Sequence, residues 1–167
     1  MDHLIVDGYN VLRTDPAYAA HFERDPDAAR ARLVEDVAAY AEGRYRATVV
    51  FDAGANRLAD GSPHHVAGVA VIFTKYGSDA DETIEALAAR DGERGRGCVV
   101  ATSDAQTQFV VMGSGARRLA SRELVAGISE TSLEQSTHTS SGSTRSRIEE
   151  RIDPRTREAL FRWARGL

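Results

Sequence analysis

Cysteine is almost absent from this chain: among 167 residues, Cys98 carries the only thiol. A single cysteine cannot form an intramolecular disulfide, which excludes the disulfide-stapled scaffolds of small secreted proteins and indicates a reducing, cytoplasmic compartment. No apolar run reaches the ~18 residues that a membrane-spanning helix needs. The first residues also lack the basic-then-apolar pattern of a secretion signal. We therefore expect no membrane partner.

Motifs of several well-known site types are missing as well. His and Cys residues do not occur at zinc-binding spacing, and the chain has neither a G-x-x-x-x-G-K-[ST] loop nor a G-x-S-x-G motif. His64 and His65 are adjacent in "SPHHVAG", a predicted loop, where such a pair is usually solvated surface. These absences leave carboxylates as the candidate catalytic groups.

Lysine is nearly absent too, since Lys75 is the only one and every other cationic side chain is arginine. Residues 1–116 carry 11 basic and 18 acidic side chains, whereas residues 117–167 carry 10 basic and 7 acidic ones. The body of the chain is thus acidic and its last third basic. Abundant Arg and Ala are also what a GC-rich genome produces, so composition alone does not select a partner.

The apolar pattern alternates between strand-like and helix-like segments. Strands are predicted at residues 3–7, 47–53, 66–74, 97–104 and, more briefly, 116–121, and helices at 26–43, 79–92, within 105–113 and at 153–167. Near-continuous Val/Ile strands separated by helices indicate a mostly parallel sheet covered on both faces. The predicted fold class is therefore α/β, a three-layer α/β/α sandwich.

The length suits one compact domain, which we expect to occupy residues 1–131. Residues 132–152 are rich in Ser, Thr and Arg and nearly free of apolar side chains, which predicts a flexible loop. The segment 153–167 begins with Asp-Pro and contains Leu160 and Phe161, so we expect a capped helix that docks on the same domain.

Acidic residues mark the carboxyl ends of the predicted strands. Asp7 ends "HLIVD", Asp52 follows "VVF" and Asp104 follows "VVATS". Asp79 and Asp81 open the helix after the third predicted strand. In an open parallel sheet these ends share the edge where binding crevices form. Each aspartate taken singly is well explained as a turn or capping residue, but their joint position predicts a shared acidic site.

Asp81 differs from the acids beside it in its position around the helix. With Ile84 and Leu87 in the buried stripe, Asp81 lies roughly 75° from the centre of that stripe, whereas Glu82 points away from it. Clustered carboxylates raise one another's pKa unless a cation is present. Mg²⁺ prefers carboxylate oxygens and keeps several waters, and such a site can polarise a phosphodiester and supply hydroxide for attack.

Five segments resemble a known family. "LIVDGYNVL", "VVFDAG", "FTKYGSDADETIEALA", "VVATSD" and "GARRLASREL" occur in this order and resemble the YacP-like branch of the NYN nucleases, in the PIN-like superfamily. The resemblance extends from residue 3 to residue 125. It implies a PIN-like α/β/α fold and Mg²⁺- or Mn²⁺-dependent endoribonuclease activity, directed at messenger RNA in association with the ribosome.

The same resemblance implies roles for single residues. Asp7, Asp81 and Asp104 match the family's catalytic, metal-binding acids. Asp52 matches the acid of the F-D-A-G stretch and is expected to line the same pocket as a further metal ligand. Asn10 corresponds to the motif's Asn and is expected to orient Asp7 or a metal-bound water.

RNA must approach an acidic site, so its binding is expected to rely on nearby cations and hydroxyls. The candidate substrate-binding residues are Arg13, Lys75, Ser103, Arg117, Arg118, Arg145 and Arg147. The arginines are equally well explained as solubilising surface.

Two other classes of protein remain open. The first is a non-catalytic RNA- or ribosome-binding module on a nuclease-like fold, which would be free to lose Asp7, Asp81 and Asp104. The second is a phosphatase or phosphoacceptor domain, which usually needs a D-x-D strand end or a lysine late in the sheet. "DGY" offers no D-x-D at Asp7, and no lysine follows Lys75.

Overall fold

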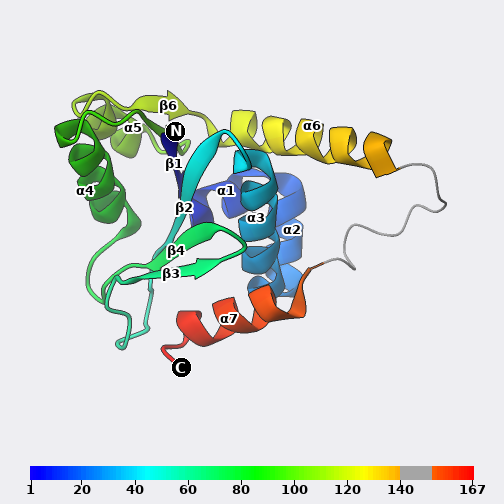
Figure 1. The fold of residues 1–167 in the computed structure, drawn as a ribbon. Coiled ribbons are helices and arrows are strands. Elements are labelled where there is room, and N and C mark those ends of the chain that lie inside the picture. Colours follow the sequence, from blue (N-terminus) through cyan, green and yellow to red (C-terminus); the bar gives the residue numbers. More distant parts are fainter. Residues whose placement is uncertain (140–151) are drawn as a thin grey trace.

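The computed structural model describes residues 1–139 and 152–167 (Figure 1). Within them, six strands form one sheet: β1 (Asp2–Asp7), β2 (Tyr45–Phe51), β3 (Pro63–Val66), β4 (Val69–Phe73), β5 (Cys98–Ala101) and β6 (Arg117–Leu119). Their spatial order is β3-β4-β2-β1-β5-β6, and every neighbouring pair is parallel except the antiparallel pair β3–β4. The predicted, mostly parallel sheet is confirmed.

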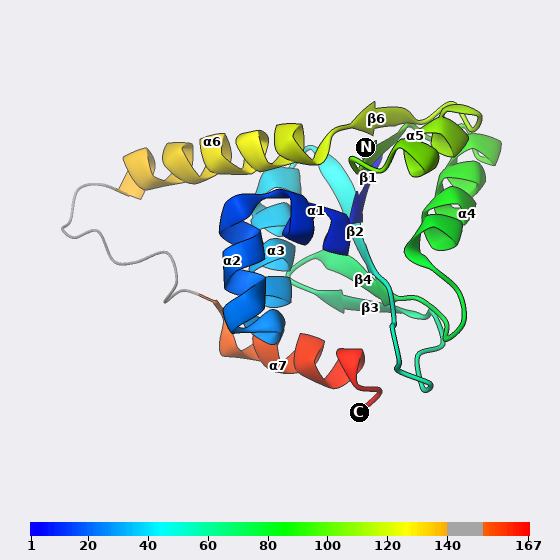
Figure 2. The same cartoon turned by 180° about the vertical axis from the view of Figure 1, so that it is seen from behind.

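Helices cover both faces of this sheet. They are α1 (Gly8–Thr14), α2 (Pro16–Arg24), α3 (Pro26–Ala41), α4 (Ala80–Glu93), α5 (Ala105–Met112), α6 (Ser121–Thr139) and α7 (Pro154–Ala164). In Figures 1 and 2, α1, α2 and α3 lie on one side of the sheet, and α4 and α5 on the other. Leu4 and Val6 of β1 pack with the first group and Ile5 with the second, as the two-residue period of a strand requires.

Asp-Pro pairs begin three of these helices. The side chains of Asp15, Asp25 and Asp153 each accept a backbone N–H from the first turn, of α2, α3 and α7 respectively. The following proline occupies the first helical position, where its missing N–H has no cost. These pairs explain why the predicted helices at 26–43 and 153–167 have the starts that the sequence indicated.

The largest correction concerns α6. Residues 132–139 were expected to belong to a loop, but the helix continues to Thr139. Its first half is anchored by buried Leu124 and Ile128, whereas Leu133 is 67 % exposed. The scarcity of apolar residues therefore marked a solvated helix rather than a loop. Residues 140–151, including Arg145 and Arg147, lie outside the described part of the chain.

A glycine explains why α6 does not resemble a helix in sequence. Gly127 lies in its middle, where glycine normally weakens a helix. A Cβ at Gly127 would come within 2.6 Å of the Tyr40 ring on α3, so the missing side chain allows the two helices to approach closely. Tertiary packing thus overrides local propensity at this position.

The expected strand at 66–74 corresponds to β4, and β3, which forms a hairpin with it, was not predicted. The turn of this hairpin is formed by Ala67 and Gly68, both with positive φ (54° and 80°). This is the conformation of the two-residue turns that join antiparallel strands. His64, expected in a solvated loop, lies on β3 and stacks on Trp163 of α7 with the ring centroids 4.6 Å apart. The helices α1 and α2, and the first part of α6, were not predicted.

Two further contacts tie α7 to the body of the domain. Leu160 is fully buried in the main core, and the Asn56 side chain donates to the carbonyl of Ala164 over 3.1 Å. Among the described residues, no helix combines the length and the apolar character needed to cross a bilayer.

Candidate active site

The topology of the sheet defines where a ligand is expected to bind. β1 is central, β2 and β4 follow on one side of it, and α4 carries the chain across to β5 on the other side. Successive strands are thus added on one side of β1 up to β4 and on its other side from β5 onward, so the strand order switches between β1 and β5. Ligands in open α/β sheets bind at the carboxyl ends of the strands at such a switch point. Asp7 ends β1 and Asp104 follows β5, so both lie beside this crevice.

Asp7 is only 7 % exposed. Its carboxylate accepts the Asn10 backbone N–H over 3.4 Å and the Thr102 hydroxyl over 3.2 Å. Burial raises the pKa of Asp7 from 3.8 to about 6; these two hydrogen bonds oppose the rise, and the charges of Asp81 and Asp104 add to it. The charges of Asp81 and Asp104 therefore act on the Asp7 carboxyl, as expected where acids lie near one another.

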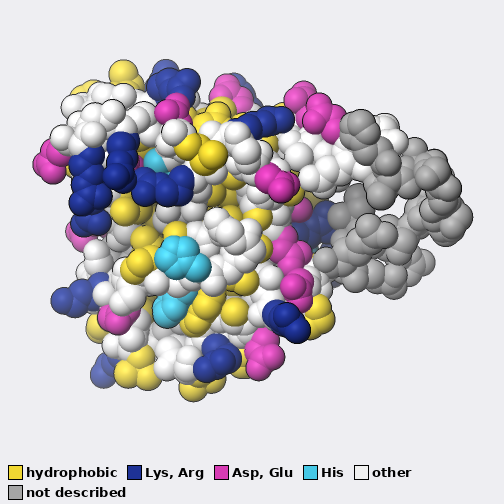
Figure 3. Space-filling model, viewed as in Figure 1, with side chains coloured by type: hydrophobic (Ala, Val, Ile, Leu, Met, Phe, Trp, Pro, Cys, Tyr) yellow, Lys and Arg dark blue, Asp and Glu magenta, His cyan; other side chains and the backbone are white. Residues whose placement is uncertain are grey.

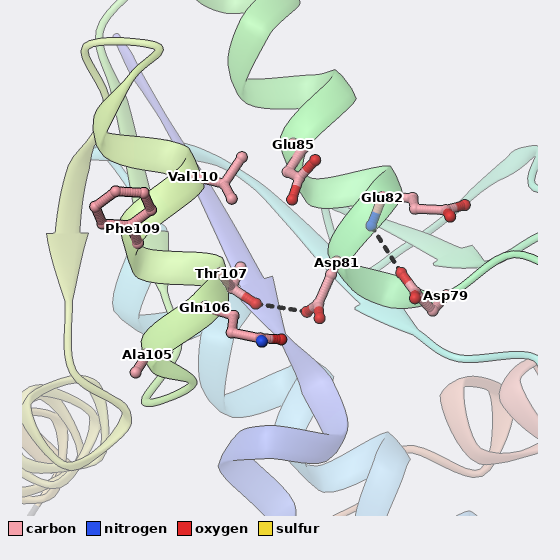
Figure 4. Close-up of a pocket in the computed structure, with 9 residues that line it drawn as sticks. All are labelled: Asp79, Asp81, Glu82, Glu85, Ala105, Gln106, Thr107, Phe109 and Val110. Carbon is pink, nitrogen blue, oxygen red and sulfur yellow. Dashed lines mark hydrogen bonds between the residues drawn. The ribbon is translucent and has the colours of Figure 1, made fainter.

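Thr107 connects the other two acids. Its hydroxyl donates to Asp81 over 2.5 Å, and its backbone N–H donates to Asp104 over 3.3 Å. Asp104 also accepts the Gln106 N–H, so it caps α5 at the same time. Figure 4 shows Asp81 on α4 and Thr107 on α5 pointing toward each other, while Glu82 points away. The orientation that helix geometry predicted for Asp81 is the one observed.

Nothing in the sequence singled out Thr107 or Ser121, which proved to contact the site residues. The side-chain amide oxygen of Asn10, Oδ1, accepts the Ser103 N–H over 2.8 Å and the Ser121 hydroxyl over 2.6 Å. Asn10 thus joins α1 to the loop after β5 and to α6, and its side-chain N–H₂ group remains as a donor. Its backbone, rather than its side chain, bonds to Asp7.

Asp52 and Asp79 have local structural roles. Asp52 is half-buried and accepts the Gly54 N–H over 2.7 Å, which closes a turn after β2. Asp79 caps α4 by accepting the Glu82 N–H over 2.9 Å.

A groove of about 550 Å³ opens between α4 and α5 (Figure 4). Asp81 and Thr107 line it, and Phe109 and Val110 of α5 form part of its apolar wall. Phe109 is 79 % exposed. The acidic site therefore continues into an open groove that is carboxylate-rich on one wall and largely apolar on the other.

The fit of these residues to a metal ion is mixed. Among the described residues, no three His, Cys, Asp or Glu side chains lie close enough together to hold a metal ion jointly. Mg²⁺, however, is commonly held by one or two carboxylates and retains several waters. Asp7, Asp81 and Asp104 supply such carboxylates, and the charges of Asp81 and Asp104 raise the pKa of Asp7. The donor chemistry suits a hydrated divalent cation.

The predicted substrate-binding residues are dispersed. Arg13 is exposed on α1, and Lys75 is exposed just after β4. Arg117 and Arg118 lie on the edge strand β6, where Arg117 forms an ion pair with Asp2 at the start of β1. Asp2 and Asp7 are at opposite ends of β1, so Arg117 lies away from the acidic site.

Comparison with known proteins gives consistent matches. The model of the YacP-like NYN domain family matches residues 4–165. The YacP protein of Bacillus subtilis (strain 168) is 38 % identical over 127 residues, which are 75 % of this chain and 74 % of YacP. A crystal structure of a mutant of Rae1 (YacP) from Bacillus subtilis aligns with a TM-score of 0.69 and 30 % identity over 96 % of this chain and 98 % of Rae1. A second Rae1 (YacP) crystal structure gives a TM-score of 0.66 and 35 % identity over 83 % and 80 % of the two chains.

Proposed function

Since this chain belongs to the YacP-like NYN domain family, whose fold is nuclease-like, we propose that it is a Mg²⁺- or Mn²⁺-dependent endoribonuclease. The observation that carries the proposal is the state of Asp7. This carboxylate is buried at the topological switch point, and its pKa is raised to about 6 by burial and by the charges of Asp81 and Asp104. A divalent cation would relieve this repulsion.

The side chains around the acids divide into ligands and positioning groups. One or two of the carboxylates of Asp7, Asp81 and Asp104 would hold the hydrated ion, which when bound would polarise a phosphodiester and supply hydroxide for in-line attack. Thr102 holds the Asp7 carboxylate in one orientation, and Thr107 fixes Asp81 relative to Asp104. Because these hydroxyls are buried, the carboxylates are preorganised before substrate arrives.

Substrate contacts would come from groups at the edge of the site. The N–H₂ group of Asn10 is a donor suited to a phosphate oxygen, since its carbonyl oxygen is already engaged by Ser103 and Ser121. Arg13 and Lys75 supply positive charge from the exposed surface. One carboxylate oxygen of Asp52 closes a turn, and its role as a further metal ligand stays a prediction.

Messenger RNA on the ribosome is the substrate we propose. The net charge of −4 and the few cations near the acids favour weak intrinsic affinity for RNA. A ribosome would offset this by holding the messenger RNA close to the enzyme at high effective concentration.

The decisive experiment is cleavage of a translated messenger RNA with Mg²⁺ or Mn²⁺, with and without ribosomes. Wild type is compared with Asp81→Asn and with Glu82→Gln, which removes the same charge one residue further along α4 but on its exposed face. Cutting that needs the metal, is lost in Asp81→Asn and survives in Glu82→Gln supports the proposal. Equal loss in both variants contradicts the assigned role of Asp81.

One observation favours a second candidate, a non-catalytic RNA- or ribosome-binding module. Within the described part of the chain no group of three or more acids is placed to hold a metal ion. If the folded protein binds ribosomes but cuts no RNA in any lane of the same experiment, this second function replaces the first.

A further inference from the structure

Four exposed arginines gather at the end of the domain opposite the acidic site. Arg46 lies near the start of β2, Arg90 and Arg94 are at the end of α4, and Arg96 precedes β5. We call these four residues the basic end. Figure 3 shows Lys and Arg side chains gathered on this part of the surface, beside α4.

The helix α4 and the strand β5 have arginines at the basic end and aspartates at their opposite ends. α4 begins with Asp81 and ends with Arg90 and Arg94, and β5 is preceded by Arg96 and followed by Asp104. At 1.5 Å per residue, Asp81 and Arg94 are separated by about 20 Å along α4. The basic end is therefore a surface separate from the acidic site.

A buried network holds the basic end in place. Asp91 is 4 % exposed; its carboxylate accepts from Arg46 over 3.2 Å and from His3 Nδ1 over 2.5 Å. Burial lowers the pKa of His3, so the ring is neutral and its Nε2 accepts the Thr48 hydroxyl over 2.7 Å. The Asp91 carbonyl also accepts the Arg96 N–H over 2.8 Å. Arg46 and the turn before β5 are thus joined through one residue.

The charges of this surface are largely uncompensated. Among the described residues no carboxylate forms an ion pair with Arg90, Arg94 or Arg96. Residues 90–97 contain two acids: Asp91, which is paired with Arg46 in the buried network, and Glu93. Arg117, by contrast, is paired with Asp2. Exposed guanidinium groups suit phosphate because their planar fork donates two hydrogen bonds at once.

We propose that the basic end binds the phosphate backbone of RNA. The contact anchors an RNA by its phosphates, independently of base sequence, about 20 Å from the acids. It shares with the proposed function only the premise that RNA is the ligand, and requires neither a metal ion nor cleavage.

The test is binding of a fluorescent RNA hairpin in EDTA, where metal-dependent cleavage cannot occur. Arg94→Gln/Arg96→Gln is compared with Arg155→Gln/Arg162→Gln, two exposed arginines of α7 that likewise have no ion pair among the described residues. Both variants change the net charge equally, so any nonspecific effect of charge is matched. Neither pair takes part in the acidic site.

We expect the basic-end variant to weaken binding about tenfold at 0.1 M salt, and to reduce the slope of log affinity against log salt by roughly 1.5. The α7 variant should stay within about twofold of wild type. Equal weakening in both variants, or none, overturns the proposal. If polyglutamate displaces the hairpin as well as unlabelled RNA does at equal charge, the surface recognises acidic protein instead. If the wild-type protein binds the hairpin through the basic end but cuts no RNA when Mg²⁺ or Mn²⁺ is added, only the proposed function is rejected.

Discussion

Replacing Asp7 by Asn should stabilise the fold at neutral pH while abolishing cleavage. The side chain is 7 % exposed and, without a metal ion, must stay ionised at pH 7 against its burial and the charges of Asp81 and Asp104. Asparagine has the same shape and no charge. A residue selected for stability alone would not show this gain.

The magnitude follows from the pKa. A carboxyl whose pKa is 3.8 in the unfolded chain and about 6 in the fold costs about 3 kcal/mol of stability at pH 7. The sign is set by proton binding: below pH 3.8 both states are protonated and the cost is absent, it develops between about pH 4 and pH 6, and it is constant above. Losing a carboxylate acceptor for the Thr102 hydroxyl offsets about 1 kcal/mol. We expect a net gain of about 2 kcal/mol at pH 7.

Urea unfolding in EDTA at about pH 4 and about pH 7 measures this difference. Asp7→Asn should exceed wild type in free energy of unfolding at pH 7 and not at pH 4. Asp52→Asn, at a turn residue, is the control and should change little at either pH. Added Mg²⁺ should raise the melting temperature of wild type and not of Asp7→Asn, because binding stabilises only the state with intact ligands. If Asp7→Asn lowers the free energy of unfolding relative to wild type by the same amount at pH 7 as at pH 4, the reasoning is refuted.

Three further changes test single contacts. Gly8→Ala would bring a Cβ within 2.4 Å of the Phe51 ring, so it should cost about 1–3 kcal/mol in urea unfolding; unchanged stability would mean that the ring moves freely. Thr107→Val keeps the shape but removes the hydroxyl that holds Asp81, and should slow RNA cleavage about 10–100-fold with unchanged circular dichroism, with Thr107→Ser restoring the rate. Leu160→Ala should lower stability by about 2–5 kcal/mol in thermal unfolding, because this fully buried side chain anchors α7; a neutral effect would show that α7 contributes little to the fold.

Several features of the fold could be predicted because they depend on short-range patterns. The parallel strands are near-continuous Val/Ile runs, and Asp-Pro pairs begin α3 and α7. The hairpin β3–β4 was missed because its turn uses Ala67 with positive φ, a conformation that alanine rarely adopts. No part of α6 was predicted as a helix, and its second half was taken for a loop because a solvated helix and a polar loop share a composition.

The sequence by itself determined which acids follow the strands, since a charged residue after a buried run can be identified without coordinates. It also determined, through the 100° step of a helix, that Asp81 faces inward and Glu82 outward. Only the tertiary structure decided which acids lie close enough to act on the charge of Asp7. Asp52 meets the same sequence criterion as Asp7 but is occupied by a turn, whereas Thr107 becomes a link because α4 and α5 lie side by side. Such links depend on how separate elements pack, and no local pattern encodes that.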